Sequence, residues 1–229
     1  MCSLLLASLL LTVAHTAVAG PPEFPLTDDM RVVRLGDSLR VNGNDVNVRT
    51  FTSTESAQEI VDFYREEWGE EKNPEPGYTV NNLKQPWTLI TRIEDDYLMT
   101  VQVQPSDNEG SKGMLAVSRL PDRNRAPKLG EGFPSMGGSD VINEVVSKDP
   151  GQSGRTMMVG NKHDMATNVD FYRDRYRTGG WSVDMDRSLG GIMHVLAVRK
   201  SRRRVNLVIS EGPDGGTLIV ANEVTHDIL

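Results

Sequence analysis

Five basic residues lie close together near the end of this chain and form its densest cluster of charge. They are Arg199, Lys200, Arg202, Arg203 and Arg204. Clustered cations attract anionic groups and raise the local concentration of acidic partners. The cluster therefore predicts an interaction surface for an acidic protein, a glycan or a lipid headgroup, and the alternative is a solvated turn.

Two acidic clusters lie in the first half of the chain. Glu66, Glu67, Glu70 and Glu71 follow one another at the end of a predicted helix, where negative charge opposes the helix dipole and favours water or a basic partner. We expect a solvated face there, or a docking patch. The second acidic cluster, residues 94–96, falls between two apolar runs, which is typical of a hairpin turn.

The residues that most often perform catalysis or bind metals have structural interpretations here. After residue 19 the histidines are His163, His194 and His226, which fit a helix cap, a strand and the C-terminal tail. No His-x-x-x-His or Gly-x-Ser-x-Gly spacing indicates a metal site or a nucleophile elbow. The methionines, among them Met158 and Met185, are expected to fill the core. We predict no catalytic, cofactor-binding or metal-binding residues.

A repeated block organises the elements that position these residues. Val61–Arg65 and Val169–Arg173 are both Val-Asp-Phe-Tyr-Arg, and Gly77-Tyr78 is matched by Gly180-Trp181. The matches predict two related units, 24–121 and 133–227. Between them lies a linker, 122–132, which is rich in Arg, Pro and Gly.

Apolar spacing assigns the repeated block to a helix in each unit. Apolar residues recur at intervals of three and four around both blocks, and the helix starts are marked by capping residues, Ser53 and Ser56 in the first block and Asn161 and Asp164 in the second. Period-two alternation further along, as in residues 99–104, predicts half-buried strands. The expected fold class is α+β: two diverged ββαβββ repeats, each with one helix packed on an antiparallel sheet.

A helix laid across a sheet can enclose a ligand. The aromatic residues of the two helical stripes, Tyr64 and Trp68 in one unit and Tyr172 and Tyr176 in the other, would line such a pocket. The alternative is a filled core without a cavity.

The unit resembles a known family in outline. An aromatic-bearing helix that ends shortly before a Gly-aromatic strand start, at Gly77-Tyr78 and Gly180-Trp181, is similar to the tandem helix-grip domains of bacterial envelope proteins, such as the C lipoprotein of the outer-membrane barrel-assembly machine. The resemblance carries over no functional residue. The family's lipid-anchor cysteine is missing, because Gly20 stands where it would be expected.

The N-terminal residues indicate export. Residues 1–19 contain an apolar run and then Ala17-Val18-Ala19, the pattern of a cleaved signal peptide. The only cysteine, Cys2, lies inside that segment, so we expect no disulfides in the mature chain. The apolar run is shorter than a membrane-spanning helix requires, so we also expect no transmembrane segment there. We predict a periplasmic or secreted location. Export and a net charge of −7 argue against a nucleic-acid partner.

Three functional hypotheses follow from these features. The first is a non-catalytic interaction or scaffold protein of the bacterial cell envelope, with an envelope protein as its partner. The second is a carrier that holds an apolar or lipid-like ligand between helix and sheet. A carboxylate-based hydrolase is the weakest of the three, because no carboxylate pair is set in contrasting environments by the sequence pattern.

Overall fold

The computed structural model describes residues 20–36, 38–69, 77–82, 86–122 and 127–227. Strands make up 53% of these residues and helices 13%, so the protein is mainly β. In chain order the elements are β1 (Arg31–Arg34), β2 (Ser38–Val41), β3 (Asn44–Ser53), α1 (Ala57–Glu67), β4 (Thr79–Asn82), β5 (Thr88–Glu94), β6 (Tyr97–Pro105), β7 (Ser111–Arg119), β8 (Asp140–Asp149), β9 (Gln152–Asn161), α2 (Met165–Thr178), β10 (Ser182–Leu189), β11 (Met193–Lys200), β12 (Arg203–Glu211) and β13 (Thr217–His226).

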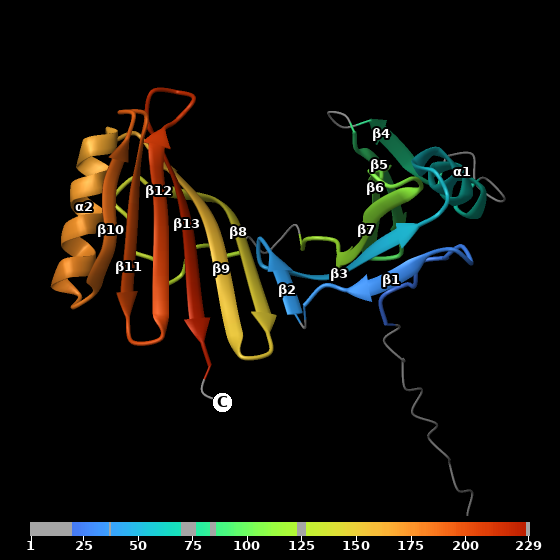
Figure 1. Cartoon of the computed structure of the whole chain (residues 1–229), viewed down its shortest axis with the longest axis horizontal. Coiled ribbons are helices and arrows are strands. Elements are labelled where there is room, and N and C mark those ends of the chain that lie inside the picture. Colours follow the sequence, from blue (N-terminus) through green and yellow to red (C-terminus); the bar gives the residue numbers. More distant parts are fainter. Residues whose placement is uncertain (1–19, 37, 70–76, 83–85, 123–126, 228–229) are drawn as a thin grey trace, which may run out of the picture.

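The expected class, α+β with two ββαβββ units, is wrong. The described strands form one antiparallel sheet in the order β10-β11-β12-β13-β9-β8-β2-β3-β7-β6-β5-β4, and β1 pairs with the far part of β3 (Figure 1). The two halves of the chain meet at β2, which pairs with β3 on one edge and with β8 on the other. Because this short strand is hydrogen-bonded on both sides, the halves share one sheet.

Each helix is followed by four strands, one more than the sequence pattern predicts. In the second half the additional strand is β10, which forms one edge of the sheet and pairs only with β11. All eight of its residues are exposed. Val183, Met185 and Leu189 alternate with polar residues only in part, because Arg187 interrupts the series and a bulge lies between Val183 and Met185, so the strand is hard to recognise from its sequence.

The two helices begin where the capping residues predict. The Ser56 side chain accepts a hydrogen bond from the backbone N–H of Glu59, whose carboxylate accepts one from the Ser56 N–H, which completes a capping box. The Asp164 carboxylate accepts from the Thr167 N–H at 2.8 Å and caps α2. These local interactions fix where both helices start.

Each helix covers only one face of its part of the sheet. Helix α1 packs on β5, β6 and β7, and α2 packs on β10, β11 and β12. The two cores are made of inward-facing strand residues and the helix aromatics. The fully buried large side chains include Tyr64, Ile60, Ile90, Met99 and Leu115 under α1, and Tyr172, Met157, Leu196, Leu207, Ile209 and Ile219 under α2.

Parts of the sequence-based predictions fall outside the described residues. These include the proposed signal segment 1–19 with Cys2, and residues 123–126 of the proposed linker. No helix in the described ranges is long and apolar enough to cross a membrane.

Candidate functional site: a basic cavity at the end of helix α2

Helix α2 ends in a tight reversal that places an aromatic ring beside the sheet. The Gly180 backbone has a φ of 73°, which glycine adopts without strain, and the Gly180 N–H donates to the Arg177 carbonyl at 3.0 Å. The Trp181 N–H then donates to the Tyr176 carbonyl at 3.0 Å, and the rings of Trp181 and Tyr176 meet edge to face at 5.2 Å. The reversal therefore fixes Trp181 against the last turn of the helix.

A cavity of about 520 Å³ opens at this end of the helix. Its lining comes from the segment before β8, from the end of α2, from the start of β12 and from the last part of β13. The residues are Gly132, Phe133, Pro134, Arg175, Tyr176, Thr178, Gly179, Trp181, Arg203 and Glu223. We call this space the basic cavity. Its walls combine aromatic rings with charged groups from three separate parts of the second half.

The charges of the basic cavity do not cancel. The Glu223 carboxylate is held by Arg155, whose Nε donates to it at 2.7 Å. Arg175 and Arg203 also line the cavity, and within the described part of the chain neither forms an ion pair. The Arg203 guanidinium lies 5.3 Å from the centre of the Trp181 ring, a cation–π contact that orients it without neutralising it. The cavity is therefore positively charged.

A buried hydroxyl group beside the cavity lacks a hydrogen-bond partner. Tyr176 lines the cavity and is only 4% exposed, and among the described residues its hydroxyl contacts no donor or acceptor; the hydroxyl of neighbouring Tyr172 is in the same state. Burial raises the pKa of both, that of Tyr172 to about 12, so both are neutral donors at physiological pH. A buried donor without an acceptor is uncommon in proteins, and here it occurs in the core at Tyr172 as well as beside the cavity at Tyr176.

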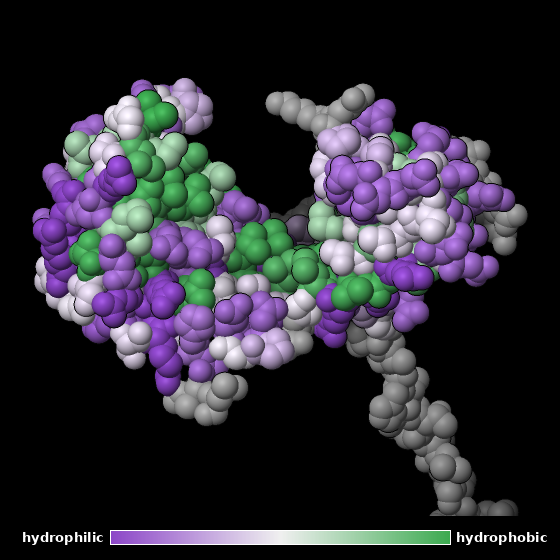
Figure 2. Space-filling model, viewed as in Figure 1, coloured by the Kyte–Doolittle hydropathy of each residue, from purple (hydrophilic) through white to green (hydrophobic). Residues whose placement is uncertain are grey.

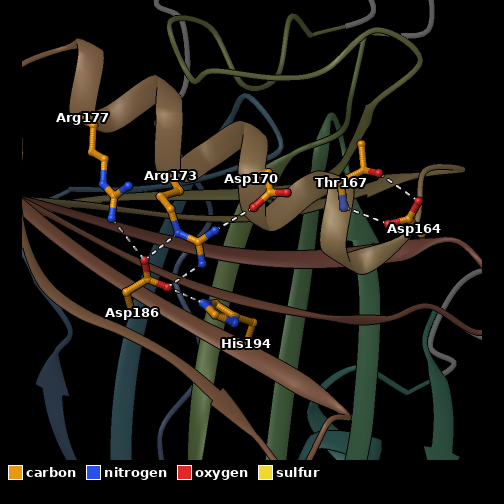
Figure 3. Close-up of polar contacts among 7 residues, drawn as sticks. All are labelled: Asp164, Thr167, Asp170, Arg173, Arg177, Asp186 and His194. Atoms are coloured by element: carbon orange, nitrogen blue, oxygen red, sulfur yellow. Dashed lines mark hydrogen bonds and ion pairs between the residues drawn. The ribbon is translucent and has the colours of Figure 1, made fainter.

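An ion-pair network anchors α2 to the edge strand β10 (Figure 3). The Arg173 guanidinium donates to both oxygens of Asp186, at 2.7 and 2.9 Å, and His194 Nε2 lies 2.7 Å from Asp186 Oδ1. Hydrogen bonds from Arg173, and then from His194, lower the pKa of Asp186 to about 2. Arg173 also donates to Asp170 at 2.6 Å. Because both Asp186 oxygens are engaged and His194 is buried, this cluster holds the helix in place and offers no open acid–base pair.

The structure separates the five predicted basic residues. Arg199 pairs with Asp184 at 2.7 Å, and Lys200 Nζ donates to the Gly179 carbonyl at 2.7 Å, where it caps α2. Arg203 enters the basic cavity, whereas Arg204 belongs to the opposite face of β12, since successive strand residues alternate. Arg202 lies in the turn and is exposed. Only Arg203 of the five joins the cavity.

The aromatic residues predicted to line a pocket fall into two groups. The Tyr64 and Trp68 rings lie 4.8 Å apart, Phe24 packs on Trp68, and the Tyr64 hydroxyl donates to the Pro25 carbonyl at 2.8 Å. The space beneath α1 is therefore filled by rings. In the second half Tyr172 is core, and Tyr176 alone of the four lines the basic cavity.

The remaining sequence predictions are placed as follows. Glu66 and Glu67 are exposed at the end of α1, and Glu70 and Glu71 lie outside the described residues. His163 precedes the α2 cap, as expected, and its Nε2 lies 3.0 Å from the Gly137 carbonyl oxygen. No group of His, Cys, Asp and Glu side chains in the described ranges could hold a metal ion.

Sequence reasoning missed Arg175, Trp181 and Glu223 as members of the site. Trp181 was marked by the Gly-aromatic match, but only as a packing residue. Arg175 precedes Tyr176 in the last helical turn, and a cation next to a core aromatic at a helix end was the available signal. No sequence signal marked Glu223, because its role depends on the pairing of β13 with β9.

No protein-family model, curated protein or solved structure matches this chain. The resemblance to tandem helix-grip domains therefore stays a prediction.

Proposed function

We propose that this protein is a non-catalytic binding protein whose basic cavity receives an anionic group of a partner. One observation carries the proposal. Two arginines without an ion pair in the described part of the chain, Arg175 and Arg203, line one cavity beside Tyr176, whose buried hydroxyl lacks an acceptor. A carboxylate or phosphate supplies acceptor oxygens for both guanidinium groups, and Tyr176 contributes its ring to the wall.

The environment of the cavity favours an anion over an apolar ligand. Desolvating two guanidinium groups under an apolar ligand would cost free energy that no contact returns. The carrier hypothesis also needs an empty space beneath a helix, and Phe24, Tyr64 and Trp68 fill that space under α1. An acidic segment of a protein partner would supply such an anion.

Location and partner class belong to the same proposal. The signal-like segment 1–19 supports export, and an exported interaction protein of the bacterial envelope would meet acidic proteins or phosphate-bearing molecules in that compartment. The engagement of Asp186 by Arg173 and His194 supports a binding role over a catalytic one.

Titration calorimetry with two probes tests this function. A peptide of alternating Glu and Gly residues represents a carboxylate partner, and inorganic phosphate represents the phosphate source. We expect at least one of them to bind, with an affinity that falls as salt is added. Arg175→Gln and Arg203→Gln should each weaken binding about 10- to 100-fold, because a charge-assisted hydrogen bond contributes about 1.5–3 kcal/mol.

Arg202→Gln is the matched control. Arg202 belongs to the same basic turn and is exposed, but it does not line the cavity. Its substitution should leave the affinity within about twofold of the parent chain. Equal losses for Arg202→Gln and Arg203→Gln would show diffuse attraction to a basic surface and would refute the cavity as the site, as would the absence of binding by both probes.

A further inference from the structure

The sheet face opposite α2 carries exposed apolar side chains on β10, β11, β12, β13 and β9, and Ile142 of β8 lies beside them. In the second half the inward residues of β11, β12 and β13 are buried beneath the helix, and the outward residues between them are left exposed or half-buried. The register aligns one outward row as Val195, Val208, Val220 and Met158, on β11, β12, β13 and β9. A second row contains Leu189, Met193 and Leu218. We call this surface the open face.

Exposure of these side chains is high for apolar residues. Met185 is 49% exposed, Val208 is 37% exposed, and Ile142, which lies over Gly160 on the same face, is 56% exposed. Figure 2 shows the apolar surface over the upper parts of β12, β13 and β9. Met158 and Met185, expected in the core, are on this surface. Monomeric proteins seldom leave an apolar patch of this extent in water.

The extent of the open face matches what a specific interface needs at its lower limit. Six strands about 4.8 Å apart span about 24 Å, and the two apolar rows together with the adjoining mixed row of Met185, Ala197 and Asn206 extend about 20 Å along the strands. A face of about 500 Å² on each of two copies gives about 1,000 Å² in a pair, the area from which specific association begins.

Charge at the two edges of the open face is self-complementary. Arg187 lies at the β10 edge, paired in register with Val195, and points away from α2 because its neighbour Asp186 contacts the helix. Asp140 lies at the β8 edge, paired with Gly160. Neither forms an ion pair in the described ranges. Two copies can face each other across a two-fold axis that lies between the sheets and runs parallel to the strands. This symmetry places β10 of one copy over β8 of the other.

We propose that the open face is the interface of a homodimer, in which two copies pack sheet on sheet and Arg187 of each copy pairs with Asp140 of the other. The apolar rows meet at the centre, where no charge is buried without a partner, and two symmetric ion pairs form at the rim. The basic cavities are on the helix side of the sheet and stay accessible. This inference is independent of the proposed anion binding.

Sedimentation velocity of the purified chain over a concentration series tests the dimer. We expect a reversible monomer–dimer equilibrium. Val208→Asp should give a monomer at every concentration, and because Val208 points to solvent in the monomer, circular dichroism should show an unchanged fold. Ala166→Asp is its control, since Ala166 is exposed on α2, on the opposite side of the sheet from the open face.

A charge swap tests the orientation without changing the apolar rows. Arg187→Asp should weaken the dimer about tenfold or more by placing like charges together, and the double variant Arg187→Asp with Asp140→Arg should restore it. A parent chain that is monomeric up to about 1 mM would overturn the proposal. A dimer that survives Val208→Asp, or a double variant no tighter than Arg187→Asp alone, would also overturn it. Binding of a monomeric chain to phosphatidylglycerol vesicles would assign the face to lipid instead.

Discussion

Replacing the two equivalent helix tyrosines by phenylalanine should lower stability at Tyr64 but not at Tyr172. Tyr64 and Tyr172 hold the same place in the repeated Val-Asp-Phe-Tyr-Arg block, and both are completely buried. The Tyr64 hydroxyl donates to the Pro25 carbonyl at 2.8 Å, whereas the Tyr172 hydroxyl has no partner in the described part of the chain. The same atom is removed in both variants, so the difference reports the hydrogen bond.

The magnitudes follow from these contacts. Tyr64→Phe loses one hydrogen bond and leaves a carbonyl oxygen without its donor, which should cost about 1–2 kcal/mol. Tyr172→Phe removes a buried polar group that is unpaired, so the free energy of unfolding should stay unchanged or rise by about 1 kcal/mol. The ring packing of both residues is retained, and no cavity larger than the hydroxyl group forms.

Urea unfolding followed by circular dichroism measures both values, provided that the dependence of stability on urea concentration is the same in each variant. A loss above about 1 kcal/mol for Tyr172→Phe would refute the reasoning, because it would show that the Tyr172 hydroxyl is hydrogen-bonded in the folded protein. An unchanged stability for Tyr64→Phe would equally contradict the role given to the Pro25 contact.

Four further predictions concern pH, capping and packing. Burial holds the pKa of Tyr172 near 12, above the value of about 10 in an unfolded chain. The free energy of unfolding therefore does not depend on the ionisation of Tyr172 below about pH 10, and it falls as the pH rises toward 12. Tyr172→Phe should reduce that alkaline loss of stability in a pH series of melting curves. Hydrogen bonds from Arg173 lower the pKa of Asp186 to about 2, so the stabilisation by this carboxylate is present above about pH 4 and is lost as the pH falls toward 2. Because solvent screens this exposed strand, Asp186→Asn should remove only about 1 kcal/mol at pH 7 and should reduce the acid dependence in urea titrations. Ser56→Ala should cost about 1 kcal/mol, measured by thermal unfolding, because the capping box of α1 is lost. Gly113→Ala should cost about 1–3 kcal/mol or more in the same assay, because the new methyl group would clash with the Gln102 carbonyl oxygen and the Phe51 ring; a stability equal to the parent would contradict the close approach there.

Local structure could be predicted from the sequence because its causes are local. Ser56 and Asp164 accept hydrogen bonds from backbone groups three residues away, and the apolar stripe of each helix repeats within a few turns. The alternating strand of residues 99–104 is confirmed as part of β6. Phe63 and Phe171, which the repeat also marks, are only partly buried and pack edge to face on the neighbouring tyrosines.

The class and the site could not be predicted because both depend on pairing between distant segments. The single sheet arises from the pairing of β2 with β8, which no local pattern encodes. A run of five basic residues cannot show which of them face α2, since that depends on strand phase, and it placed Arg203 and Arg204 in one cluster although they occupy opposite faces. The open face was hidden for a related reason, because inward and outward rows of β11 are both apolar.

The first half of the chain offers an internal control for the basic cavity. Tyr97 is the first residue of β6, and Arg203 is the first residue of β12. The Arg119 guanidinium lies 5.5 Å from the centre of the Tyr97 ring. Both line a cavity of about 610 Å³ whose other charged residues are Arg34, Asp45 and Asp122. When only the lining groups are counted, two arginines and two aspartates cancel in this cavity, whereas two arginines exceed the one glutamate in the basic cavity, so anions have less attraction to the first cavity although it is the larger one. The anion probes should therefore bind the second half only, and Arg119→Gln should leave their affinity unchanged while Arg203→Gln reduces it.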